Sequence, residues 1–357
     1  MRNVWVSLSW RALVNIEALN MAESAGNYIK HRRAPIAFYD EASRSFIIKY
    51  VPVISGESLA HAYQALLAQE AHNAGLNVCN YCLRGELVKH GARVILEEEK
   101  DLPPLPKGRD RESREKAAEL EKELIKRCVV EDVGGFLVPT EVPVKRTSLF
   151  YIGYMVPAYD SFKVAVADPQ FHVRHAPSLI GVGEGSSEAG REEFRETGQA
   201  IYVVELASAV YTASAALNVT GIGCTSTFSI ECILKNEERL KRAEVALKSL
   251  YYLLVGMFGA KRTRFLPHYR LLSAVAAVVK GAPFNVEPGH TKGFVHRTWE
   301  RAQKFKELTG SEVSLFAYVE EGGVEVPEGV ERAESPEDLI KKLKERALTA
   351  LEGVLGT

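Results

Sequence analysis

The chain has 357 residues, and 46% of them are hydrophobic, so it can form a sizeable core in one elaborated domain or in two. Its 45 Lys and Arg against 46 Asp and Glu give a formal net charge of −1, unlike the overall basic charge of most small nucleic-acid-binding domains. Because the sequence has no apolar run of about 18 residues and no secretory signal pattern, we expect a cytoplasmic protein without a membrane partner.

The first predicted strand covers about 4–17, and a loop at 20–35 follows it. Gly26 frees the backbone of this loop and Pro35 ends it. Between them lie four consecutive potential cations, Lys30, His31, Arg32 and Arg33. Burying four such groups would need several buried partners, so we favour phosphate contact. The alternative is an exposed loop whose charges are only solvated.

A short hairpin at 36–50 and an amphipathic helix at 57–74 come next. Ser55 is a candidate N-cap of that helix, and Gly56 would let a ligand approach the free amides of its first turn. Many helices begin in this way for stability alone, so this anion site remains one of two interpretations.

Residues 76–130 are predicted to be an inserted, mostly helical segment, with a highly charged helix near 111–126 whose charges we expect to face solvent. A CxxC pair, Cys79 and Cys82, lies in this segment between His72 and His90. Zinc, a disulfide and free thiols are all open at this pair. We favour free thiols and expect no metal or cofactor, because no matched second pair is obvious and the other three cysteines, Cys128, Cys224 and Cys232, are isolated.

Strands are predicted at 132–138 and 148–156, and two further basic clusters lie beyond the insertion. They are Lys145-Arg146, followed by two hydroxyl residues, and Lys261-Arg262-Thr263-Arg264, which follows a helix predicted at 236–255. Mixed hydroxyls and arginines are common at phosphate contacts. The second cluster has an alternative role, since cations also stabilise helix C-termini. We expect Arg32, Arg146 and Arg262 to be surface charges whose removal leaves stability nearly unchanged.

A Gly-, Ser- and Glu-rich segment at 176–199 is predicted to be a long flexible loop. His172 and Arg174 precede it and alternate onto one face of a strand, where we expect them to contact a bound chain or to organise the loop rather than to catalyse. The alternative is a histidine that is merely exposed or at the core edge. Residues 200–217 follow as a long strand or hairpin arm.

The remaining predicted elements are a strand at 269–279, a helix at 292–308, a strand at 313–319 and a helix at 336–353. With the earlier elements they give an α+β fold in the ferredoxin-like order, the plan of a modified RNA-recognition-motif core with a helical insertion and long loops. We expect a discontinuous core at 1–75 and 131–320, the insertion at 76–130 and a C-terminal helical segment at 321–357. Because no aromatic sheet motif is evident, RNA contacts would come from loops and helix ends.

Several ordered motifs resemble the backbone subunit of archaeal type I-A CRISPR Cascade, which is also grouped with DevR-type proteins. The resemblance runs from about residue 10 to about 270, and more weakly to the C-terminus. It is carried by Gly26-Asn27, Lys30-His31-Arg32, Val51–Gln64, Asp132–Phe136, Arg146-Thr147-Ser148, Gly153–Ala158, His172-Val173-Arg174 and Phe258–Pro267.

This resemblance implies a subunit that binds guide RNA along its backbone, polymerises along it into a helical filament and presents the guide for pairing with target DNA. The implied partners are other copies of the chain, other Cascade subunits, and a helicase and a nuclease. The candidate RNA-binding residues are Asn27, Lys30, His31, Arg32, Arg33, Ser55, Gly56, Lys145, Arg146, His172, Arg174, Lys261, Arg262 and Arg264.

Catalysis is not expected, because nucleolytic relatives carry an aspartate in the first basic loop and residues 26–35 contain no acid. His31 or His172 could still serve as a general acid or base. A metal-independent RNA endonuclease of the same fold superfamily and a DNA-binding regulator therefore remain the alternatives.

Overall fold

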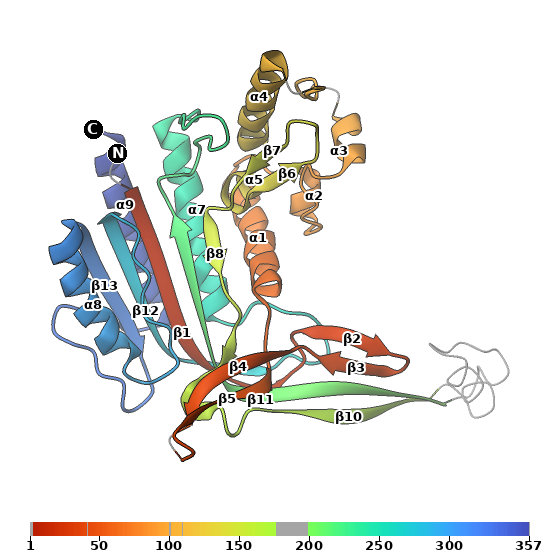
Figure 1. Cartoon of the computed structure of the whole chain (residues 1–357), viewed down its shortest axis with the longest axis vertical. Coiled ribbons are helices and arrows are strands. Elements are labelled where there is room, and N and C mark those ends of the chain that lie inside the picture. The colour runs from red at the N-terminus through yellow and green to blue at the C-terminus, as the bar shows by residue number, and fades with distance from the viewer. Residues whose placement is uncertain (1–2, 41, 100, 109, 176–198, 357) are drawn as a thin grey trace.

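A computed structural model describes residues 3–40, 42–99, 101–108, 110–175 and 199–356. At its centre, four antiparallel strands lie in the order β12 (His268–Gly281), β1 (Asn3–Glu17), β11 (Gln199–Asn218) and β8 (Phe150–Ile152) (Figure 1). The chain connects β1 to β8 through α1 (Gly56–Asn73), and β11 to β12 through α7 (Asn236–Leu254). The protein is thus a mixed α+β fold, as the sequence predicts.

Helices cover both faces of this sheet near β12. β12 alternates, so that Ala274, Ala276 and Val278 pack into the core beneath α1, α7 and α9 (Pro336–Leu355). Its intervening residues Val275, Ala277 and Val279 pack into a second core with α8 (Phe294–Thr309). This two-sided burial explains the nearly unbroken apolar sequence of β12, which a half-exposed strand would not have.

The sheet continues beyond β12 through β13 (Glu312–Val319) and β14 (Glu331–Ala333). Short elements complete the other edge: β9 (Val156–Pro157) pairs with β11, and the 3-10 turn η1 (Tyr159–Ser161) follows it. The long, strongly periodic segments of the C-terminal half therefore have the elements that the sequence predicts.

A two-stranded arm extends away from this body (Figure 1). β10 (Val166–His175) pairs with residues 199–208 of β11, whereas residues 207–218 of β11 pair with β1 in the sheet. The long strand predicted at 200–217 is confirmed. Of the loop predicted at 176–199, residues 176–198 lie outside the described part of the chain.

The predicted loop at 20–35 is wrong, because this segment is mostly strand. β2 (Met21–Ala25) and β3 (Tyr28–His31) form a hairpin whose turn has Gly26 at a φ of 60°, and β3 pairs with β11. β4 (Arg33–Asp40) then pairs with β5 (Ser45–Pro52) in a second hairpin. Pro35 lies within β4, so it does not end the segment.

The segment predicted as a helical insertion contains α2 (Asn80–Leu83), α3 (Arg93–Glu98) and the charged α4 (Arg111–Arg127), and α5 (Val129–Gly134) follows. A small hairpin of β6 (Phe136–Val138) and β7 (Val144–Arg146) packs against α4. The strand predicted at 132–138 therefore begins only at Phe136, because α5 occupies the preceding residues.

Cys224 and Cys232 form a disulfide, so the prediction that they are isolated thiols is wrong. The loop between them folds back and brings the two residues into an antiparallel bridge, a contact that residue spacing alone does not reveal. Within the described ranges, no helix is both long and apolar enough to cross a membrane.

Candidate nucleic-acid interface

Two of the predicted basic segments line one cavity of about 370 Å³ beside the β10–β11 arm. The β2–β3 turn contributes Gly26 and Asn27, and the loop after α7 contributes Lys261 and Arg264. Gly259 allows this approach: it has a φ of 87°, and a Cβ there would lie 2.6 Å from Leu19. The cavity thus has a backbone turn on one side and cations on the other.

His172 lies beside this cavity and is held between aromatic rings. It stacks on Tyr202 with ring centroids 5.1 Å apart and meets Phe265 edge-on at 5.6 Å. Both Tyr202 and Phe265 line the cavity. The predicted strand face is confirmed, because His172 and Arg174 share one side of β10, and Arg174 is exposed.

Three predicted contact residues carry buried nitrogens without a hydrogen-bond partner among the described residues. They are Arg32 Nε, Arg262 Nε and His172 Nε2. Buried polar atoms are rarely left unpaired in folded proteins. Arg262 lies in the loop that lines the cavity, next to the lining residues Lys261 and Thr263.

The other predicted cations differ in how exposed their side chains are. Lys30, Lys145, Arg174 and Arg264 are exposed, and Lys261 is half-buried. Arg33 is exposed but lies 3.3 Å from Glu205, which also accepts from the Tyr28 hydroxyl and the His31 amide. Its charge is therefore partly compensated within the protein.

His31 is not available at the surface, contrary to the sequence expectation. Its side chain is fully buried, and its Nε2 lies 2.7 Å from Glu17 Oε1, which also accepts from the Tyr211 hydroxyl. Burial by itself lowers the pKa of His31, but the hydrogen bond and charge of Glu17 outweigh it and raise that pKa overall. His31 is thus an internal ion-pair partner.

Arg146 is also internal, so the expectation of a surface charge is wrong. Its side chain is 1% exposed and donates to Asp132 Oδ1 at 2.5 Å. Further donations reach the carbonyls of Asp132, Gly221 and Cys224. Arg242 pairs with the other oxygen of Asp132 at 3.0 Å. This buried network joins α5, β7 and α7, and it explains the Asp132–Phe136 and Arg146–Ser148 motifs structurally.

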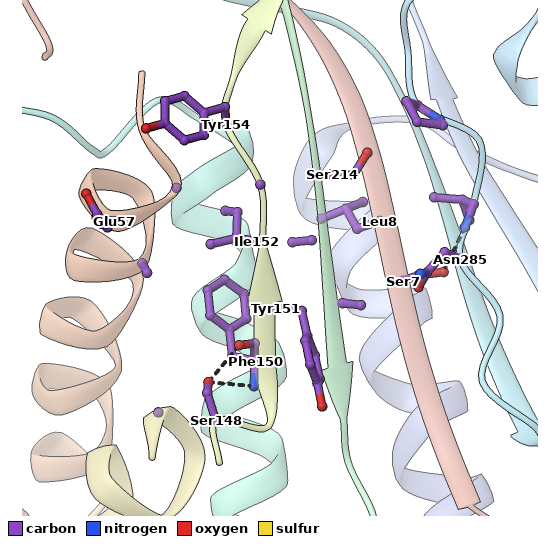
Figure 2. Close-up of a pocket in the computed structure, with 18 of the residues that line it drawn as sticks. Ser7, Leu8, Glu57, Ser148, Phe150, Tyr151, Ile152, Tyr154, Ser214 and Asn285 are labelled. Atoms are coloured by element: carbon purple, nitrogen blue, oxygen red, sulfur yellow. Dashed lines mark hydrogen bonds between the residues drawn. The ribbon is translucent and has the colours of Figure 1, made fainter. Parts of the chain in front are cut away.

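Ser55 caps α1 as predicted, since its hydroxyl accepts from the Ser58 amide at 3.2 Å. The approach of a ligand to the amides after Gly56 stays a prediction, since Gly56 is partly exposed. A Cβ there would lie 3.0 Å from the carbonyl oxygen of Ile152, so this glycine also permits close packing against the end of β8. It lines a separate, largely apolar cavity of about 910 Å³ that lies over β8, β11 and β1, with α1 on one side and Asn285 on the other (Figure 2).

Sequence reasoning missed the aromatic residues of the site. Tyr202 lies opposite His172 in the β10–β11 ladder, and Phe265 belongs to the third basic segment. The alternation of β11 was visible in the sequence, but the pairing of Tyr202 with His172 depends on the register of two strands separated by a long segment. That register is a tertiary property.

Comparison with known proteins gives consistent results. The family model for the CRISPR-associated negative auto-regulator DevR/Csa2 matches residues 8–298. The CRISPR-associated aCascade subunit Cas7/Csa2 2 of Saccharolobus solfataricus is 38% identical, covering 95% of this chain and 99% of the relative. A Cas7/Cst2/DevR protein of Methanocaldococcus jannaschii is 25% identical over 96% of this chain and 100% of the relative. A solved chain of a pre-nicking CRISPR RNA-guided surveillance complex has the same fold, with a TM-score of 0.56 at 12% identity, covering 96% of this chain and 100% of that one.

Proposed function

This chain belongs to the CRISPR-associated DevR/Csa2 family, and on that premise we propose that it is the guide-RNA-binding backbone subunit of an archaeal Cascade complex. It works in the cytoplasm in antiviral defence. Its partners are CRISPR guide RNA, further copies of itself and the other Cascade subunits. Target DNA joins through pairing with the guide, and the helicase and nuclease act on that DNA.

The strand order supports an RNA-recognition-motif core. β1, α1, β8, β11, α7 and β12 follow one another as strand, helix, strand, strand, helix, strand. Their lateral order in the sheet, with β1 and β11 central and β12 and β8 outside, is that of a ferredoxin-like domain. The helical insertion at 76–130 and the C-terminal segment after residue 320 are elaborations of this core.

The single observation that carries the RNA proposal is the cavity shared by the β2–β3 turn and residues 261–265. Its polar groups are a backbone turn, lysine, threonine and arginine, which suit phosphate and sugar rather than base edges. A guide must be bound whatever its sequence, and its bases must remain free to pair. Lys30, Arg32, Arg262 and Arg264 are the principal cations in this proposal.

Copies of the chain assemble along the guide through their projecting hairpins. The β10–β11 arm and the β4–β5 hairpin both extend from the body (Figure 1). They expose large apolar side chains, including Phe46, Ile48 and Tyr50 on β5 and Phe171 and Val173 on β10. Exposed apolar groups on projecting strands suit contact with a neighbouring subunit. A head-to-tail contact that does not close gives a filament whose length follows the RNA.

The subunit does not cleave RNA in this proposal. Residues 26–35 contain no acid, and His31 is buried against Glu17, out of reach of a scissile phosphate. His172 is held by Tyr202 and Phe265 and serves as a stacking residue. Incubating the protein with labelled guide and repeat RNA, with and without divalent metal, tests this. Specific cleavage that disappears in His172→Ala would establish the endonuclease alternative instead.

The binding proposal is tested by titrating single-stranded RNAs of unrelated sequence at several salt concentrations. We expect similar affinities and a steep salt dependence, with about 0.7 counterions released per phosphate contact. A flat salt response, or strong preference for one RNA sequence, would contradict it. Preference for one duplex DNA sequence over RNA would support a regulator.

A further inference from the structure

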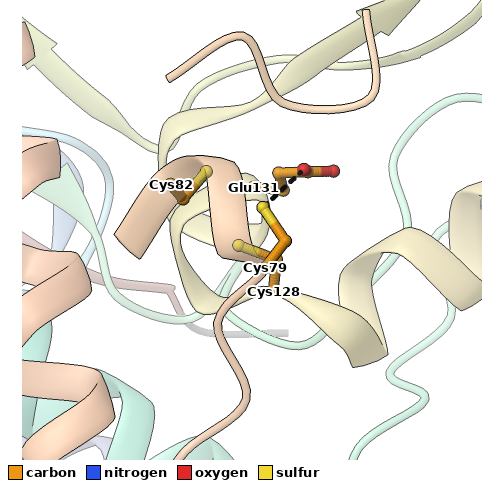
Figure 3. Close-up of side chains that lie close together, drawn as sticks. All are labelled: Cys79, Cys82, Cys128 and Glu131. Atoms are coloured by element: carbon orange, nitrogen blue, oxygen red, sulfur yellow. Dashed lines mark hydrogen bonds between the residues drawn. The ribbon is translucent and has the colours of Figure 1, made fainter. Parts of the chain in front are cut away.

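Three cysteines and a glutamate meet where the inserted segment joins the core, in a cluster that the RNA proposal does not use. Cys79 is the N-cap of α2 and Cys82 lies within it, whereas Cys128 lies between α4 and α5 and Glu131 is in the first turn of α5. Figure 3 shows the four side chains converging. One potential ligand atom from each lies within 4.8 Å of all the others.

These separations suit a tetrahedral zinc ion. Zinc–sulfur bonds of about 2.3 Å give sulfur–sulfur edges of about 3.8 Å in a tetrahedron, so a small contraction of the cluster would enclose the ion. Cys79 Sγ already lies 3.7 Å from Glu131 Oε1. Thiolate-rich tetrahedral sites favour zinc over magnesium or calcium, which prefer oxygen ligands.

Burial provides an independent indication of a ligand. Cys82, Cys128 and Glu131 are all fully buried, and Cys79 is half-buried. Glu131 Oε2 has no hydrogen-bond partner among the described residues. A buried carboxylate oxygen without a donor is costly, and the cost is removed when the oxygen binds a cation. The cluster therefore has the ligand atoms of a metal site, and one of its oxygens, Glu131 Oε2, has no protein donor among the described residues.

His90 completes the surroundings as a positioning residue. Its Nδ1 lies 2.6 Å from Glu131 Oε1, and its Nε2 lies 3.2 Å from Glu99. Pairing between a histidine and a ligating carboxylate is a common way to fix a metal ligand in place. The adjacent Lys89 donates to the Gly134 carbonyl at 2.9 Å. These two basic residues lie where three thiolates and a carboxylate would leave excess negative charge.

We propose that Cys79, Cys82, Cys128 and Glu131 bind one structural Zn²⁺ ion. The cysteines coordinate as thiolates, so their protons pass to solvent when the ion binds. The ion joins α2 to the α4–α5 junction. Among the described residues between α2 and α4, the short α3 is the one helical element, so this link fastens the insertion to the core. The proposal does not depend on RNA binding.

Metal analysis of the full chain, purified without chelator and freed of nucleic acid, tests this directly. We expect about one zinc per chain, because a closed structural site retains its ion. Replacing zinc with Co²⁺ should give thiolate-to-cobalt charge-transfer bands and the visible bands of tetrahedral cobalt. Both measurements use the unmodified protein, so they do not depend on a variant that folds poorly. Iron in place of zinc, no bound metal, or a Cys79–Cys82 disulfide found by mass spectrometry would overturn the proposal.

Substitutions of the proposed ligands test where the zinc ion binds. Cys82→Ser and Cys128→Ser should lose the stoichiometric zinc, and His90→Ala should weaken zinc binding by about 10–100-fold. The matched control is the double variant Cys224→Ser/Cys232→Ser, which removes the other two cysteines and should keep its zinc. Loss of zinc from the control, or full retention in Cys82→Ser and Cys128→Ser, would place the metal elsewhere and refute the assignment.

Discussion

Replacing Arg146 with methionine should destabilise the fold strongly. The change removes the ion pair with Asp132 and the Arg146 donations to the carbonyls of Asp132, Gly221 and Cys224, of which the Gly221 carbonyl still accepts from the Cys224 amide. Breaking a buried pair by removing one partner costs about 3–5 kcal/mol. Arg242 and the Gly223 amide still compensate Asp132, so we expect a loss near the lower end of about 3 kcal/mol.

Chemical denaturation of wild type and Arg146→Met measures this loss, and Lys145→Met is the matched control. Lys145 is the exposed neighbour of Arg146 in β7, so its replacement should change the free energy of unfolding by within about 0.5 kcal/mol. If Arg146→Met unfolded like wild type while its RNA affinity fell, Arg146 would be a surface contact and the reasoning from its burial would fail.

Three further predictions concern the surface and the buried histidine. Arg264→Gln should weaken RNA binding and reduce the slope of log affinity against log salt concentration by about 0.7 for each phosphate that the variant no longer neutralises. Its free energy of unfolding should stay within about 0.5 kcal/mol of wild type. An unchanged slope would exclude a phosphate contact. His172→Ala should lower RNA affinity about tenfold, or ~1.4 kcal/mol, and wild-type affinity in the variant would exclude stacking. Because the folded pKa of His31 is raised, its protonated pair with Glu17 stabilises the protein fully below the unfolded pKa of about 6.5. That contribution is lost as the pH rises through the folded pKa, so the stability difference between wild type and His31→Gln should shrink from pH 5.5 to alkaline pH. A stability difference that grew with pH would contradict a raised pKa of His31 in the folded state.

The helices and strands were predictable where a regular pattern of apolar residues extends over many positions. The segments that became α1, α7, α8 and α9 each place apolar residues at helical spacing, and the long apolar strands β1 and β12 have few polar interruptions. These patterns persist because both faces of the sheet near β12 are buried. Local propensity and tertiary packing agree in these elements, so the sequence alone was sufficient.

The segment at 20–35 was misread because its charges dominated the interpretation. Four adjacent potential cations indicate a loop, but alternation in β3 and β4 sends successive side chains to opposite faces. His31 therefore turns inward to Glu17, while Lys30 and Arg33 remain exposed. The inward partner lies in β1, and nothing local to residues 20–35 reveals it.

The burial of Arg146 and the proximity of Cys128 to Cys79 and Cys82 were missed for the same physical reason. Arg146, Arg242 and Gly223 approach Asp132 from three separate segments, and Cys128 approaches Cys79 and Cys82 from the far end of the insertion. Contacts of this kind are set by how α4 and α5 return to the core. The CxxC pair was visible in the sequence, but its third and fourth partners became visible only in the fold.

Sequencing of the nucleic acid that co-purifies with the protein tests the central claim most directly. A backbone subunit that binds guide RNA through its sugar–phosphate chain should carry short single-stranded RNA of varied sequence, seen first as a raised ratio of absorbance at 260 nm to that at 280 nm. Nuclease treatment should leave protected fragments whose length grows with the number of assembled copies. Protein that carries no RNA and fails to bind added single-stranded RNA at low salt would contradict the account, and so would protein that retains one defined sequence or duplex DNA.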